Sequence, residues 1–405
     1  MAIDLRGRAW TSLLGLAAGD ALGSQFFVPA HRAAFEARTL PPGPWQWTDD
    51  TEMACGIWKV LARTGRIDQD LLAAVFAEHH DFDRGYGPST NRLLRLVREG
   101  GDWRTLASGV FDGRGSWGNG AAMRVAPLGV WFAGDLDLAA EQARLSAEVT
   151  HAHPEAVAGA IAVAVAAALA ATGPGKPGPF LDRILAHVPE GTVRDGIRQA
   201  RTLLTIGDPA SAAAALGNGR QVAAHDTVPF CLWAAARHLD GCERDGFEAG
   251  FWATASAGGD IDTTCAIVGG ILAARPGTRI PAAWLPHLEP LPSWIGPPGQ
   301  RDGGMTMDEL FAEPPAQWGL RGDPHAWAAL RERLNAMPVP EDPARLEDLL
   351  AATFLDVVGV DPRTATGEHV YREEFAHGGM SSGHVHLPTW RDRLLPLLLA
   401  RGTRH

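Results

Sequence analysis

The chain has 405 residues and a formal net charge of −11, and 46% of its residues are hydrophobic. This composition supplies a large buried core and excludes disorder for most of the chain. The acidic balance argues against a nucleic-acid coat or a membrane-surface protein, so an anionic ligand needs local arginines or backbone N–H groups. The cysteines (Cys55, Cys231, Cys242 and Cys265) are too scattered for a disulfide framework, and no secretory signal is convincing. A cytoplasmic location is expected.

Apolar residues recur with a helical period along the chain up to about residue 275, and strand signals are scarce. The predicted helices cover residues 10–20, 51–63, 69–80, 90–99, 138–151, 155–171, 193–206, 228–238 and 263–274. The uncharged run at residues 156–174 consists mostly of alanine, which favours lipid weakly. We therefore expect a buried helix there and no membrane span.

Proline and glycine cluster around residues 291–305 without any hydrophobic period, as in a linker. The predicted organisation is a helical domain over residues 1–292, a linker over 293–322 and a C-terminal domain over 323–405. In the last domain, the pattern predicts helices at 325–335, 344–357 and 389–401 and a hairpin with strands near 368–373 and 384–387. The fold class is therefore all-α with a small α+β C-terminal domain.

Two acidic segments, Thr48-Asp49-Asp50 and Asp260-Ile261-Asp262-Thr263, each stand at the start of a predicted helix. Asp and Thr are favoured helix caps, so capping alone is the simpler interpretation of either segment. Both segments are more acidic than capping requires, and adjacent carboxylates repel each other unless positive charge lies between them. Four carboxylates with threonine hydroxyls form an all-oxygen set that suits two divalent cations, Mg²⁺ or Mn²⁺.

Residues 113–124 contain a glycine-rich segment, in which backbone N–H groups can approach a ligand closely. The segment lacks the GxxxxGK[ST] pattern and follows no predicted strand, so a nucleoside-triphosphate P-loop is not expected. The alternative is an ordinary flexible loop.

Taken in order, these segments resemble one family. Residues 19–23 (GDALG), 48–51 (TDDT), 115–124 (GSWGNGAAMR) and 259–263 (GDIDT) follow the arrangement of the ADP-ribosylglycohydrolases over residues 10–275. The segment 81–87 (DFDRGYG) and His151 look closest to the branch that removes serine-linked and polymeric ADP-ribose.

The resemblance implies an all-helical fold with a two-metal centre in a cleft. The residues implied to hold two Mg²⁺ ions, with Mn²⁺ as an alternative, are Thr48, Asp49, Asp50, Asp260, Asp262 and Thr263. The residues implied to line the diphosphate and the distal ribose are Gly115, Ser116, Trp117, Gly118, Asn119 and His151. Tyr86 is expected on the adenine side.

One position departs from the family pattern. Phe27 stands where the family usually has a glutamate that acts on the attacking water or the acceptor. The predicted catalytic residues are therefore Asp50 and Asp262 at the metals, with Asp81 and Asp83 as candidate bases.

The resemblance implies a hydrolase that cleaves the C1″ glycosidic bond of ADP-ribosyl groups, with ADP-ribose or an ADP-ribosylated macromolecule as its partner. One alternative is a non-catalytic reader of ADP-ribose or a nucleotide. The other is a hydrolase of a small ADP-ribosyl metabolite. The sequence leaves the acceptor and the oligomeric state open.

Overall fold

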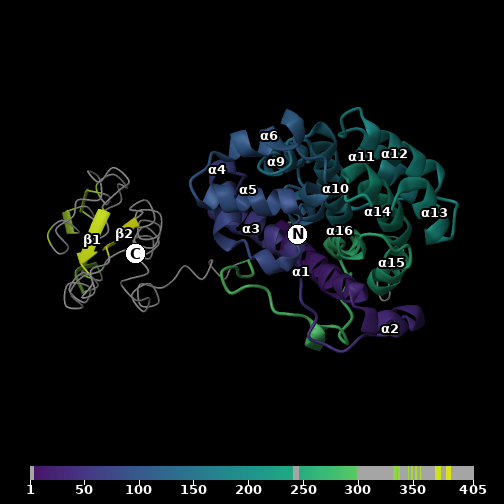
Figure 1. Cartoon of the computed structure of the whole chain (residues 1–405). Coiled ribbons are helices and arrows are strands. Elements are labelled where there is room, and N and C mark those ends of the chain that lie inside the picture. The colour runs from purple at the N-terminus through teal and green to yellow at the C-terminus, as the bar shows by residue number, and fades with distance from the viewer. Residues whose placement is uncertain are drawn as a thin grey trace. The chain divides into compact units, whose positions relative to one another are not determined.

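The computed structural model of the chain describes residues 4–239 and 246–298, single residues and short runs between 332 and 356, and the strands 370–374 and 380–384. The chain divides into two compact units, Met1–Asp302 and Gly303–His405. In Figure 1 the described part of the first unit is built from helices. This confirms the all-α body that the sequence predicts.

The helices of the first unit are α1 (Leu5–Ser24), α2 (Arg32–Ala37), α3 (Asp49–Thr64), α4 (Gln69–His79), α5 (Pro88–Arg98), α6 (Trp103–Gly113), α7 (Gly120–Met123), α8 (Ala126–Trp131), α9 (Leu136–Glu148), α10 (Pro154–Thr172), α11 (Pro177–Leu185), α12 (Thr192–Thr202), α13 (Pro209–Leu216), α14 (Ala224–His238), α15 (Gly246–Ala255) and α16 (Ile261–Ala274). Each helix predicted before residue 275 is present, with shifted ends. The sequence did not predict α2, α6, α7, α8, α11, α13 and α15, most of which are short segments beside glycine or proline.

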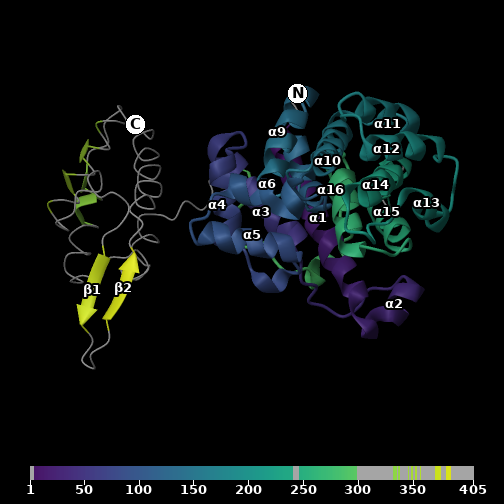
Figure 2. The ribbon, with the colours of Figure 1, turned by 45° about the horizontal axis from the view of Figure 1, so that its top comes forward.

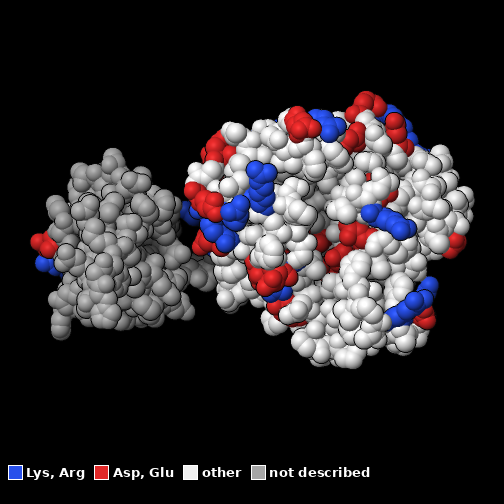
Figure 3. Space-filling view, in the orientation of Figure 1, with Lys and Arg blue, Asp and Glu red and all other residues white. Residues whose placement is uncertain are grey.

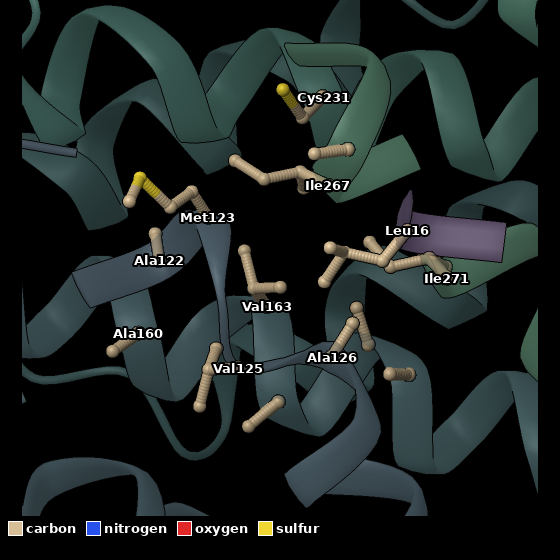
Figure 4. Close-up of a cluster of buried hydrophobic side chains, with 14 of the residues drawn as sticks. Leu16, Ala122, Met123, Val125, Ala126, Ala160, Val163, Cys231, Ile267 and Ile271 are labelled. Atoms are coloured by element: carbon tan, nitrogen blue, oxygen red, sulfur yellow. The ribbon is translucent and has the colours of Figure 1, made fainter. Parts of the chain in front are cut away.

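Helix α10 lies in the core of the first unit. Its residues Ala158–Ala171 are buried, and it packs against α7, α8, α9, α14 and α16. Figure 4 shows the meeting point, where Val163 lies among Leu16, Met123 and Ile267. By length and composition this helix could cross a membrane, yet 83% of its most apolar stretch is buried inside the structure. The prediction of a buried helix is confirmed.

Helices α1 and α16 pack closely because glycines line their contact. An added Cβ would come within 2.2 Å of Ala273 Cβ at Gly15, 2.1 Å of the Cys265 carbonyl oxygen at Gly19, and 2.8 Å of Asp262 Cα at Gly23. These glycines recur every four residues and therefore share one face of α1. Figure 2 shows the two helices side by side. Their contact brings the end of α1 to the start of α16.

The second unit contains an antiparallel hairpin of β1 (Val370–Glu374) and β2 (Met380–His384), in which Val370 pairs with His384. Of the second predicted strand, 384–387, only His384 belongs to the described residues, and it is the last residue of β2. All described residues of the predicted helices 325–335 and 344–357 are helical. The predicted helix 389–401 lies outside the described residues.

The start of the predicted linker packs against the first unit. The Trp294 ring stacks on His79 at 3.9 Å, and the Trp58 indole donates to the Gly296 carbonyl oxygen at 3.0 Å. Residues 299–322 lie outside the described part, and the domain boundaries stay a prediction.

Candidate active site

Asp20 is buried in α1 and accepts hydrogen bonds from the start of α3. Thr48 donates from its backbone N–H (2.9 Å) and its hydroxyl (2.8 Å), and Thr51 donates from its hydroxyl (2.5 Å) and its N–H (3.2 Å). Burial raises the pKa of Asp20 to about 6, although these donors oppose the rise. Asp20 therefore fixes the first turn of α3, and with it Asp49 and Asp50, against α1.

Asp50 lies in that turn and is only 1% exposed. Its Oδ2 lies 3.0 Å from the Thr48 hydroxyl, whose single proton is donated to Asp20, and it accepts from the Thr263 hydroxyl (3.4 Å), whereas its Oδ1 is buried with no hydrogen-bond partner. Burial, followed by the charges of Asp20 and Asp262, raises the pKa of Asp50 well above its usual value. A buried acceptor without a donor is rare and destabilising, so this oxygen indicates a position for a cation.

The second acidic segment faces the first. Asp260 occupies the N-cap position of α16 without a side-chain capping bond, and its Oδ2 accepts from the Asn119 side-chain amide (2.7 Å). Asp262 Oδ1 accepts from the Thr263 N–H (2.8 Å). Burial and then the charge of Asp260 raise the pKa of Asp262 well above its usual value. Burial and then the charge of Asp20 raise the pKa of Asp49 to about 8. The residues predicted as metal ligands therefore meet at one place.

This cluster fits a divalent cation. Carboxylate oxygens of Asp20, Asp50 and Asp262 all lie within 4.8 Å of one another. Figure 3 shows acidic side chains gathered at the middle of the helical unit, at the level of α16. Buried carboxylates at such distances either bind protons, as the raised pKa values indicate, or share a cation. Oxygen donors favour Mg²⁺ or Mn²⁺ over zinc.

The glycine-rich segment lies over the loop that follows α9. Gly115 has φ +73°, and an added Cβ would lie 2.8 Å from the His153 nitrogen, so no side chain fits there. His151 packs beneath Gly120, where a Cβ would lie 2.7 Å from its ring. Burial, followed by the charge of Arg124, lowers the pKa of His151 to about 3. His151 is therefore a neutral support of the loop.

Trp117 projects from this segment and is partly exposed. Its ring contacts Phe111, with centroids 4.7 Å apart, and Phe111 itself is 43% exposed. Two accessible aromatic rings beside a glycine-rich loop form a surface on which a planar base can stack. The sequence pattern did not indicate Phe111, which precedes the glycines.

The turn at residues 81–86 lies beside Asp49, because an added Cβ on Gly85 would be 3.7 Å from Asp49 Oδ1. Asp81 and Asp83 are exposed there, and Asp81 Oδ1 accepts from the Asp83 N–H (3.1 Å). Tyr86, which is expected on the adenine side, is buried and only 6% exposed. Its hydroxyl donates to Glu52 (2.7 Å) in the first turn of α3, so it supports the site from behind.

Arg84 joins this turn to Trp47, the residue before Thr48. Its guanidinium donates to the Trp47 carbonyl oxygen (2.9 Å) and lies 3.5 Å from the Trp47 ring centroid. It also forms a two-point ion pair with Glu289 (2.8 and 2.9 Å), and Glu289 accepts from the Trp47 N–H (3.3 Å). This Arg84–Glu289 pair holds the segment that carries the metal-ligand candidates.

We expect Arg84→Met to raise by about tenfold the Mg²⁺ concentration at which half of the Mg²⁺-induced rise in unfolding temperature is reached. The reason is that loss of a residue that orients metal ligands typically weakens metal binding by at least this factor. Thermal unfolding in a series of Mg²⁺ concentrations measures this. Arg104→Met is the matched control, since Arg104 also pairs with an aspartate, Asp70 (2.7 Å), and lies over a tryptophan, Trp103 (4.4 Å). An equal change in both variants would contradict the assignment.

Comparisons with known proteins agree with this geometry. The sequence model of the ADP-ribosylglycohydrolase family matches residues 1–314. The chain belongs to this family. An uncharacterised protein from Archaeoglobus fulgidus is 32% identical over 293 residues, which cover 68% of this chain and 90% of that protein. Human ADP-ribosylhydrolase ARH3 is 29% identical over 323 residues, covering 68% of this chain and 88% of the relative.

A solved structure also resembles this ADP-ribosylglycohydrolase. It is described as an ADP-ribosylglycohydrolase-related protein complex and is 27% identical, with a TM-score of 0.51 over 71% of this chain and 93% of that chain. The family resemblance that the sequence predicts is therefore confirmed, and the chain is a hydrolase of glycosidic bonds. Most of the second unit lies beyond the family match.

For two residues of this ADP-ribosylglycohydrolase, Asp20 and Phe27, the sequence motifs did not reveal the surroundings that the structure shows. Asp20 was part of the GDALG motif, yet its place beside Asp50 and Asp262 depends on the packing of α1 against α16. Phe27, in the short 3₁₀ turn after α1, is 52% exposed, and its ring can neither bind a metal nor move a proton.

Proposed function

We propose that this ADP-ribosylglycohydrolase cleaves the C1″ glycosidic bond of ADP-ribosyl groups on a modified protein or nucleic acid, with two Mg²⁺ ions. The observation that carries the proposal is the buried group of Asp20, Asp50 and Asp262 with the unpartnered Asp50 Oδ1. Mg²⁺ bound by these oxygens would hold the ribose hydroxyls and lower the pKa of a nearby water.

The chain's own residues would divide the remaining work. Asp20 orients the start of α3 and thereby presents the carboxylates of Asp49 and Asp50. The glycine-rich loop offers backbone N–H groups to the diphosphate, and Trp117 with Phe111 offers rings to the adenine. Binding the substrate at both ends would orient C1″ for attack by water, which is where such alignment accelerates a reaction.

A proton acceptor must replace the family glutamate that Phe27 lacks. Asp83 is the stronger candidate, because it is exposed and its carboxylate has no hydrogen bond or ion pair to a described residue. The Asp81 carboxylate, in contrast, caps the 3₁₀ turn that follows it, and its Oδ2 lies 3.5 Å from Arg84 Nε. The transition state would resemble an oxocarbenium ion, as in glycosyl cleavage generally. Asp83 would accept a proton from the attacking water.

The test is release of free ADP-ribose from serine-, arginine- and nucleic-acid-linked substrates, measured with purified protein and Mg²⁺. We expect turnover of at least one substrate and none in the presence of a chelator. If no modified acceptor is cleaved, hydrolysis of macromolecular adducts is wrong.

A reader of ADP-ribose is the second candidate, and Phe27 is the observation that favours it. Calorimetry with ADP-ribose beside the turnover assay separates the two functions, because binding without release indicates a reader.

As part of the proposal we place the protein in the cytoplasm, since Cys55, Cys231 and Cys265 are buried free thiols, as a reducing compartment allows.

A further inference from the structure

The proposed function requires a positive group for the diphosphate, and the arginines of the motifs do not supply one. Arg84 is paired with Glu289, and Arg124 is fully buried, where it donates to the Ser146 carbonyl oxygen (2.8 Å). Arg114 donates to the Phe111 carbonyl oxygen (3.1 Å) and lies over Trp117. Each guanidinium therefore has a partner within the fold.

Residues 217–223, between α13 and α14, form a third loop at the site. The Asp260 N–H donates to the Asn218 carbonyl oxygen (3.0 Å), and an added Cβ on Gly219 would lie 2.5 Å from Asp260 Cβ. On its other side, the Asn119 N–H donates to the Val222 carbonyl oxygen (3.2 Å). The loop thus bridges the second acidic segment and the glycine-rich segment.

This third loop is held in a defined shape. Asp226 Oδ2 accepts from the Gln221 N–H (2.8 Å), and the Gly219 N–H donates to the Asp226 carbonyl oxygen (2.9 Å). Val222 has φ +54°, which is unfavourable for a β-branched residue. Strain of this kind persists where surrounding contacts impose it, commonly at binding sites. The loop is therefore preorganised.

Arg220 lies in this loop between its two anchor points, Gly219 and Val222. It is exposed, and its guanidinium has no hydrogen bond, ion pair or ring contact to a described residue. We propose that Arg220 binds the diphosphate of the ADP-ribosyl substrate, an inference that rests on the proposed function.

The physical reason is the charge of the site. Two Mg²⁺ ions at Asp49, Asp50, Asp260 and Asp262 would balance the charge of these four carboxylates, so the negative charge of a diphosphate is left to backbone N–H groups, which oppose it only in part. A guanidinium offers several donors that match phosphate oxygens, and a loop that is already ordered limits the entropy lost on binding. Arg220 would therefore contribute to affinity for phosphate-bearing ligands and not to the recognition of the base.

The experiment compares binding of ADP-ribose, ADP and adenosine to the full chain with Mg²⁺ by calorimetry. For Arg220→Met we expect ADP-ribose and ADP to bind about tenfold to a hundredfold more weakly, as a charged hydrogen bond implies, with adenosine unchanged. Arg220→Lys should restore part of the affinity. The control is Arg66→Met, because Arg66 is also an exposed arginine whose side chain has no partner among the described residues. Arg66 follows the C-terminal end of α3, and the 16 residues of this helix, about 24 Å long, separate it from the acidic residues at the helix start.

The outcomes separate this inference from the proposed function. If the wild-type chain binds ADP-ribose and Arg220→Met binds it equally well, the role of Arg220 is wrong and the proposed function stands. An equal loss for adenosine also overturns it, because the variant would then act through the shape of the loop. If the wild-type chain binds no ADP-ribose, the proposed function fails, and the inference fails with it.

Discussion

Asp262→Asn is expected to reduce ADP-ribose release by more than about a hundredfold, and Asp50→Asn should do the same. Mutation of a residue that only hydrogen-bonds to a metal ligand typically lowers metal affinity or activity ten- to a hundredfold. Loss of a ligand itself should therefore lower the activity by more than this. Both carboxylates lie within 4.8 Å of Asp20 in the acidic cluster. Initial rates at saturating Mg²⁺ measure the effect, and retained activity would contradict the metal-site assignment.

Stability distinguishes this result from misfolding. Without metal, and at a pH above the raised pKa values of these carboxyls, each variant should unfold at a higher temperature than the wild type, because one of several repelling buried charges is gone. With Mg²⁺, the variants should gain little, whereas the wild type gains by binding. The matched control is Asp137→Asn, since Asp137 is the second residue of α9 as Asp262 is of α16, but its side chain is 93% exposed. A drop in metal-free stability would indicate damage to the fold.

The metal-free protein should lose stability as the pH rises from about 7 to about 8. Burial and the charge of Asp20 raise the pKa of Asp49 from 3.8 to about 8, and burial with neighbouring carboxylates raises the pKa values of Asp50 and Asp262 well above their usual value. A carboxyl whose pKa is raised in the folded state contributes stability that is complete below its unfolded pKa and is lost as the pH passes its folded pKa. The total loss should be on the order of a few kcal/mol.

The pH window is chosen because His151 has the opposite effect at lower pH. Its pKa falls from 6.5 to about 3 on folding, so its contribution is present above pH 6.5 and is lost as the pH falls. Above about pH 7 the carboxylates therefore dominate. Urea unfolding in chelator measures the slope, excess Mg²⁺ should flatten it, and Asp49→Asn should reduce it. A metal-free stability that rises across this window would refute the assignment of raised pKa values.

Much of the helical body could be predicted from the sequence because long amphipathic or alanine-rich segments carry their own signal. Helix α10 is such a segment, and its burial follows from its apolar composition. Helix α8 was missed because it is only six residues long and begins with alanine and proline. Helix α15 was missed because its apolar residues lie all around the helix, with Glu248 as its one charged residue, and form no single apolar face. Their helical form depends on packing against residues that are distant in the sequence, which a local pattern does not indicate.

By itself, the sequence determined the chemistry of the site: the carboxylates and hydroxyls that are its candidate metal ligands, its glycine-rich loop and its order of family motifs. Tertiary structure decided which residues share that site. Asp20 lies beside Asp262 only because Gly19 and Gly23 let α1 approach α16, and the Tyr86 hydroxyl donates to Glu52. Arg84 pairs with Glu289, whereas the Arg220 guanidinium has no partner among the described residues. These outcomes depend on contacts between residues far apart in the chain, and such contacts cannot be inferred from the local sequence.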